Sequence, residues 1–151
     1  MTIRAFIPAV VLASVVAMGA PLAAHHSFNM FEVRPEAEVI LDGVVKDWNF
    51  TNPHSWLTIT VTNPDGTQTD WSFEAAAVAA LVPRGITVNT YKVGDKVKVA
   101  GGPLKDGRKG GILKFVQHAD GTFTLPNDAG PIGQDALDRF KARNAKGVVG
   151  K

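Results

Sequence analysis

The sequence contains no cysteine among its 151 residues. This absence excludes a disulfide framework, a thiolate metal site, a cysteine nucleophile and a cysteine-linked lipid anchor. The fold must therefore be held together by its hydrophobic core. With 45% hydrophobic and 20% charged residues, the composition is typical of one globular domain that can bury such a core.

Signatures of catalysis are also missing. The sequence has no nucleophile elbow, phosphate-binding loop, HExxH zinc motif or dinucleotide-binding fingerprint. The glycine pairs Gly101-Gly102 and Gly110-Gly111 are expected in turns and bulges, not around a phosphate. An enzyme needs a converging set of acid–base or nucleophilic groups, and only the histidines could supply one. The sequence therefore favours a binding or accessory module over an enzyme.

A long hydrophobic run occurs only at the N-terminus. Arg4 precedes the apolar stretch Ala5–Met18, and a segment of small, turn-prone residues follows up to Ala24. This layout predicts that residues 1–24 form a secretory signal peptide, cleaved after Ala23 or Ala24. The alternative is an uncleaved anchor, since residues 5–24 could nearly span a bilayer. Pro8, Pro21 and the alanine-rich end favour cleavage, which predicts a periplasmic or secreted protein without a membrane span.

The chain also lacks a strong excess of either charge. Removing Arg4 with the signal peptide from the 16 basic residues leaves 15 basic against 14 acidic side chains. The pI of about 9.0 is therefore not a nucleic-acid signature. No basic stripe interleaved with aromatic residues is present either. We expect no nucleic-acid partner.

Alternating apolar residues predict β-strands in the first half of the mature chain. A long strand, bent at Gly43, is expected from Ala37 to Trp48. The segments Trp56–Thr62 and Thr67–Phe73 follow, joined by the turn Asn63–Gly66. Antiparallel pairing of these three strands is expected.

The second half predicts one short helix and further strands. The alanine-rich segment Glu74–Val82 has helical spacing, and Glu74 would favour the helix dipole. Strands are then expected at Lys96–Ala100, Ile112–Gln117 and Thr122–Leu125, with Gly101-Gly102-Pro103 breaking the first of them. This order predicts a mainly β, OB-like antiparallel barrel of five to six strands over residues 37–125. Residues 25–36 would form an arm, and residues 126–151 a linker with a C-terminal helix at Asp135–Lys146. The apolar stripe of this helix, Leu137 and Phe140, is narrow, so weak docking is expected.

The candidate metal ligands are the four histidines, His25, His26, His54 and His118. Cleavage after Ala24 would give His25 a free α-amine next to its imidazole, and cleavage after Ala23 would put His26 in third place. Both arrangements suit Cu(II), which prefers nitrogen ligands in a plane. The alternatives are a solvated histidine pair at the junction, a turn role for His54 and a surface position for His118.

Five further residues are candidates for lining a ligand groove. They are Trp48, Asn52, Trp56, Trp71 and Glu74. Packing in the barrel core or at its rim is the alternative for the tryptophans. Stabilisation of the first turn of the helix is the alternative for Glu74.

Short motifs are spread along the chain: His25-His26-Ser27-Phe28, Leu41-Asp42-Gly43-Val44-Val45, Trp48, Asn52-Pro53-His54, Trp71, Glu74, Gly94-Asp95-Lys96-Val97, Gly102-Pro103 and Asp106-Gly107. Together they resemble a family of small exported bacterial proteins classed only as a domain of unknown function. The resemblance covers most of residues 25–125, although the approach to Asn52 through Phe50-Thr51 is slightly longer than the pattern. It implies an exported β-barrel and supplies no activity.

The sequence thus leads to three hypotheses about function. The first is an exported binding or accessory protein that takes a small ligand or binds Cu(II) through its N-terminal histidines. The second is a copper-dependent redox enzyme that uses a terminal histidine. The third is a structural module that adds a strand to another envelope protein through its short final strand.

Overall fold

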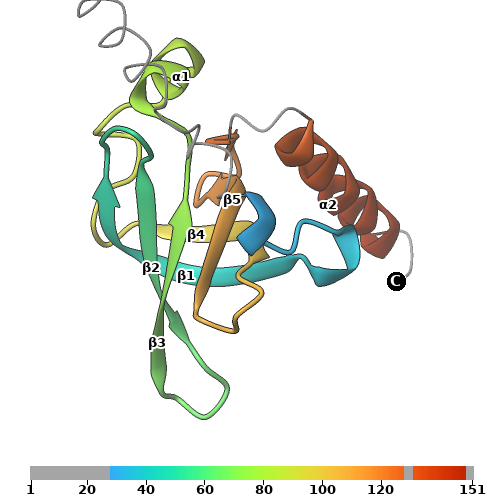
Figure 1. Cartoon of the computed structure of the whole chain (residues 1–151). Helices are drawn as coiled ribbons and strands as arrows, with labels where there is room; N and C mark the ends of the chain where they lie inside the picture. Colours follow the sequence, from blue (N-terminus) through green and yellow to red (C-terminus); the bar gives the residue numbers. More distant parts are fainter. Residues whose placement is uncertain (1–27, 128–130, 149–151) are drawn as a thin grey trace, which may run out of the picture.

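The computed structural model describes residues 28–127 and 131–148 (Figure 1). The strands are β1 (Val39–Asn49), β2 (Trp56–Thr62), β3 (Gln68–Glu74), β4 (Lys96–Pro103), β5 (Gly110–His118) and β6 (Phe123–Thr124). The helices are α1 (Val78–Leu81), α2 (Ile132–Val148) and the 3-10 helices η3 (Phe28–Met30), η4 (Pro35–Ala37) and η5 (Val82–Arg84). None of these helices is both long enough and apolar enough to cross a membrane.

The strands form one six-stranded sheet in the order β3-β2-β1-β4-β5-β6. Neighbours in this order are antiparallel. A parallel pairing of β3 with β5 closes the first five strands into a barrel; it runs from the pair Ser72–Gly110 to the pair Glu74–Ile112. The two-residue strand β6 extends the sheet beyond β5. This arrangement confirms the predicted mainly β barrel of five to six strands. The expectation that it is antiparallel throughout is wrong, because the β3–β5 pairing that closes it is parallel.

The core fills the interior of this barrel because the strands alternate. In β2, Leu57 and Ile59 are fully buried, whereas Thr58 and Thr60 lie on the outer face. The buried members of the core are Val45, Trp48, Leu57, Ile59, Phe73, Ala75, Ala76, Leu81, Ile86, Tyr91, Val97, Val99, Leu113 and Val116. The period-two pattern of the sequence therefore predicts the inward face of β2 correctly.

Glycines 101, 102, 110 and 111 were expected to interrupt the strands or lie in turns and bulges. They instead lie within β4 and β5. β4 continues through Pro103, with one register shift between Ala100 and Gly101, and both Gly110 and Gly111 lie within β5. A Cβ at Gly101 would lie 2.5 Å from Cε1 of Phe73, and one at Gly111 would lie 2.1 Å from the carbonyl oxygen of Gly102. These positions need glycine because neighbouring strands and a core ring approach them closely.

This close packing makes a stability prediction. We expect Gly111→Ala to lower the free energy of unfolding by about 1–3 kcal/mol, because its methyl group would meet backbone that cannot move aside. Gly43→Ala is the comparison variant within β1 and should cost less. There a Cβ would lie 2.9 Å from the movable Cδ1 of Ile59, and the nearest backbone atom, Thr60 O, is 3.0 Å away rather than 2.1 Å. Urea unfolding of the two variants measures the difference. An equal loss in both would show that the β4–β5 contact is not the tighter one.

The predicted helix Glu74–Val82 is shorter than expected. Glu74 is the last residue of β3, and regular α-helix occurs only at α1, followed directly by η5. Residues 75 and 76 stay non-helical because backbone hydrogen bonds tie them to Ser55: Ala75 N–H donates to Ser55 O (2.8 Å) and Ser55 N–H to Ala76 O (3.1 Å). Ala77 is the N-cap of α1. The interpretation of Glu74 as a first-turn helix residue is therefore wrong.

Both flanking segments pack on the barrel. Phe31 of the arm is buried and forms a β-bridge with Leu104, with Glu32 N–H donating to Pro103 O (2.8 Å). Helix α2 lies beside β5 (Figure 1) and is longer than the predicted Asp135–Lys146. Its buried residues Ala136, Leu137 and Phe140 pack with Ala100 and Phe115 of the sheet. This contact is more extensive than the weak docking expected from its narrow apolar stripe.

Candidate functional site

The structure brings His54 and Glu74 together. His54 lies in the connection between β1 and β2, and its Nδ1 is hydrogen-bonded to Oε1 of Glu74 at the end of β3. The backbone hydrogen bonds of Ser55 with Ala75 and Ala76 hold this connection against the end of β3. Glu74 is almost completely buried, while 41% of the His54 side chain is exposed. The carboxylate therefore orients an imidazole whose other face reaches solvent.

This contact has a chemical consequence. When the Nδ1–H of a neutral imidazole donates a hydrogen bond to a carboxylate, Nε2 carries the free lone pair and can bind a metal ion. Metal-binding histidines commonly carry such a carboxylate partner, which fixes the ring orientation and raises the ligand basicity. The His54–Glu74 pair thus has the arrangement of one ligand with its supporting group.

Trp56 stands next to this pair. It pairs with Glu74 in the β2–β3 register and points outward, because Leu57 after it points into the core. Trp56 is 37% exposed and lines a cavity of about 210 Å³ with Met30 and Phe31 of the arm. Of the five predicted groove residues, Trp56 and Glu74 are the two that lie side by side.

The other three groove candidates have structural roles. Trp48 is a core residue that donates its indole N–H to Thr87 O (3.0 Å) and packs edge-on against Tyr91. Oδ1 of Asn52 accepts the backbone N–H of Val78 (3.1 Å) and so caps the start of α1.

Trp71 belongs to the inward-facing side of β3. Its ring stacks on Phe73 at 6.0 Å between centroids, and Lys109 Nζ lies 5.3 Å above it. The predicted groove residues therefore do not form a single groove.

His118 is not the exposed turn residue expected from the sequence. It is the last residue of β5, is half-buried, and its ring stacks on Tyr91 with centroids 5.5 Å apart. Its Nε2 lies 3.2 Å from Oγ1 of Thr124, which also lies 2.6 Å from the Tyr91 hydroxyl. Burial raises the pKa of Tyr91, so this hydroxyl stays protonated at neutral pH.

No third ligand joins His54 within the described ranges. In residues 28–127 and 131–148, no three His, Asp or Glu side chains form a group that could hold a metal ion. His25 and His26 lie outside the described residues. Of the four predicted metal ligands, the structure thus places His54 beside a carboxylate and His118 in an aromatic cluster.

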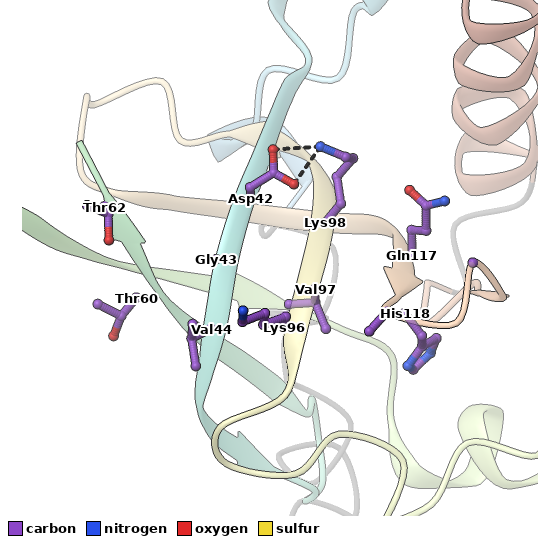
Figure 2. A pocket seen from close by; sticks show the side chains of 12 residues that line it. Asp42, Gly43, Val44, Thr60, Thr62, Lys96, Val97, Lys98, Gln117 and His118 are labelled. Atoms are coloured by element: carbon purple, nitrogen blue, oxygen red, sulfur yellow. Dashed lines mark hydrogen bonds and ion pairs between the residues drawn. The ribbon is translucent and has the colours of Figure 1, made fainter. Parts of the chain in front are cut away.

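A larger groove of about 530 Å³ crosses the outer face of β1 and β4. Figure 2 shows Asp42 and Lys98 pointing toward each other at one end, where Lys98 Nζ lies 2.5 and 2.6 Å from the two carboxylate oxygens. Val44 and Lys96 lie further along the groove. No sequence motif indicates this groove. The alternation of Lys96 and Lys98 with Val97 and Val99 predicts only a polar outer face for this strand.

Comparison with known proteins identifies a family and no characterised relative. No curated protein and no solved structure matches the chain. The model of a family of unknown function, DUF6152, matches residues 11–114, a range that includes His54, Trp56 and Glu74. This is in keeping with the resemblance seen in the sequence to a family without an assigned activity. The chain belongs to the DUF6152 family of unknown function.

Proposed function

We propose that this protein is an exported accessory protein that binds Cu(II) through its mature N-terminal histidines together with His54. The observation that supports the proposal is the hydrogen bond between His54 Nδ1 and the buried carboxylate of Glu74. Residues 1–24 would be removed on export to the periplasm or the medium. The new N-terminus would then supply an α-amine and one or two imidazoles.

Copper chemistry fits these donors. Cu(II) favours nitrogen ligands in tetragonal geometry and stands at the top of the affinity order for divalent first-row metals. Cleavage after Ala24 would let the amine and imidazole of His25 chelate the ion together. Cleavage after Ala23 would use the amine, two amide nitrogens and His26. Cleavage after Ala23 would fill the four planar positions with N-terminal nitrogens alone. Cleavage after Ala24 would leave room for His54, oriented by Glu74, to supply a nitrogen from the barrel, and this is the form that we propose.

The position of Met30 supports a site that combines the N-terminal segment with His54. Glu74, which contacts His54, pairs with Trp56, and Trp56 lines one cavity with Met30. His26 precedes Met30 by four residues in the sequence and His25 by five. A chain spans at most about 3.5 Å per residue, so five residues can cover about 18 Å. This length of chain supports a site that the N-terminal histidines would share with His54.

The test is a copper titration of the exported, processed protein, followed by electron paramagnetic resonance after intact-mass determination of the N-terminus. We expect His54→Ala and Glu74→Gln each to weaken Cu(II) binding by about 10- to 100-fold. His118→Gln is the matched control and should bind like wild type, because His118 lies in the Tyr91 cluster. A Met placed before the mature N-terminus should also weaken binding.

Each variant can contradict a separate part of the proposal. Equal affinity of wild type and His54→Ala would remove the barrel histidine from the site. Equal affinity of wild type and the Met-extended protein would remove the N-terminal nitrogens. The alternative hypothesis of a redox enzyme predicts a further result. Copper-loaded protein would turn over a reductant with peroxide, and His25→Ala would abolish this turnover.

A further inference from the structure

We infer a second binding site, in the cavity between Trp56 and the arm, for a small aromatic carboxylate. This goes beyond copper binding and does not depend on it. The apolar walls of the cavity are formed by Met30, Phe31, Trp56 and Leu104. Met30 and Trp56 are two of the exposed large hydrophobic side chains, 42% and 37% exposed, and they share this one cavity. Exposed apolar side chains that gather in this way mark interaction sites.

The wall that faces Trp56 is fixed by the backbone. Lys105 N–H donates to Met30 O (2.9 Å) and Glu32 N–H donates to Pro103 O (2.8 Å). Phe31, between these two bonds, is buried and bridges to Leu104. The cavity therefore lies between two elements, β2 and the arm, whose backbones are both held by hydrogen bonds.

Size and chemistry limit the ligand. A volume of about 210 Å³ is below the roughly 300–1,000 Å³ of sites that hold drug-sized molecules, so a single ring with a short side chain fits best. The indole of Trp56, the ring of Phe31 and the thioether of Met30 all favour contact with another aromatic ring. These side chains favour an aromatic over a purely aliphatic occupant.

Charge indicates an anion. Two cationic residues, Arg108 and Lys109, line the cavity together with Ser72 and Gly111. No carboxylate is among the described residues that line it. Arg108 is held in place by Asp106, with its Nε 2.8 Å from Oδ2. Lys109 lines the cavity and has no acidic partner within the described residues. Its Nζ lies 5.3 Å from the centre of the Trp71 ring, and its exposed side chain would turn from there toward the carboxylate of a bound ligand.

The test titrates the full mature protein, kept metal-free with a chelator, with 4-phenylbutyrate and with the neutral 4-phenylbutanamide by isothermal calorimetry. We expect the carboxylate to bind about tenfold more tightly than the amide, which corresponds to about 1.4 kcal/mol. Lys109→Gln should remove this preference, whereas Trp56→Ala should weaken both ligands. Lys96→Gln, in the groove of Figure 2, is the control and should change neither affinity.

Three results would overturn the inference. The first is equal affinity for the carboxylate and the amide, or no binding of either. The second is wild-type affinity in Trp56→Ala. The third is tighter binding of octanoate than of phenylbutyrate, which would indicate an aliphatic occupant. Because the protein is metal-free, none of these results bears on copper binding, and a failed copper titration would leave this site unaffected.

Discussion

Removing either member of the buried ion pair between Glu38 and Lys114 is expected to lower the free energy of unfolding by about 3–5 kcal/mol. Lys114 is fully buried in β5, its Nζ lies 3.0 Å from Oε2 of Glu38, and the Glu38 side chain is only 2% exposed. In Glu38→Ala the ammonium group of Lys114 would keep, among the described residues, only the carbonyl of Val33, 3.3 Å away, as a hydrogen-bond acceptor. The unpaired charge would then stay in a medium that solvates it poorly.

The surrounding charges supply the controls. Arg139 also donates to Oε2 of Glu38 (3.1 Å), and Arg143 lies 3.5 Å from Oε1, which makes no hydrogen bond within the described residues. Because Arg143 is 59% exposed, Arg143→Ala should cost about 1 kcal/mol or less.

Replacing both members of the pair tests the mechanism. The double variant Glu38→Leu with Lys114→Met should recover most of the loss, because no buried charge remains. Urea unfolding of the single and double variants checks this. Losses below about 1 kcal/mol in both single variants would mean that water reaches the pair.

Trp48→Ala is expected to destabilise the protein by about 3–5 kcal/mol, whereas Trp56→Ala should cost about 1 kcal/mol or less. Trp48 is 8% exposed, contacts Tyr91 edge-on with centroids 4.9 Å apart, and loses its hydrogen bond to Thr87 on truncation. Trp56 leaves no cavity in the core because its ring already borders solvent.

Denaturant unfolding of both tryptophan variants, followed by circular dichroism, measures the two losses. Circular dichroism is preferred because each substitution also removes a fluorophore. A loss above about 3 kcal/mol for Trp56→Ala would place its ring among the core side chains. It would also remove Trp56 from the proposed binding cavity.

The strands could be predicted from the sequence because their side chains alternate with a period of two. In β2, Leu57 and Ile59 alternate with Thr58 and Thr60, and this alternation predicts a strand with one buried face. The segment after β3 was ambiguous, because Ala75, Ala76 and Ala77 suit a helix by composition. The backbone groups of Ala75 and Ala76 instead bond to Ser55 and to Pro126, partners far away in the sequence that local propensity cannot reveal.

The candidate site was predicted only in part for the same reason. His54 stood out because it is one of four histidines and follows a proline. Its partner Glu74 follows 20 residues later. The alanine-rich sequence after Glu74 predicts a helix there, so it gives no sign that Glu74 pairs with His54. Lys114 interrupts an apolar strand, and nothing local indicates that Glu38, 76 residues earlier, neutralises it.

The charge cluster around Glu38 also affects the order in which the chain can mature. Glu38 lies just before the first strand, while its partners Lys114 and Arg139 follow 76 and 101 residues later. Contacts of such long sequence separation form late and slow folding. During synthesis from the N-terminus, the barrel strands emerge before α2 does. Phe115 and the Glu38–Lys114 pair therefore gain their full cover only when Ile132–Val148 docks on the barrel.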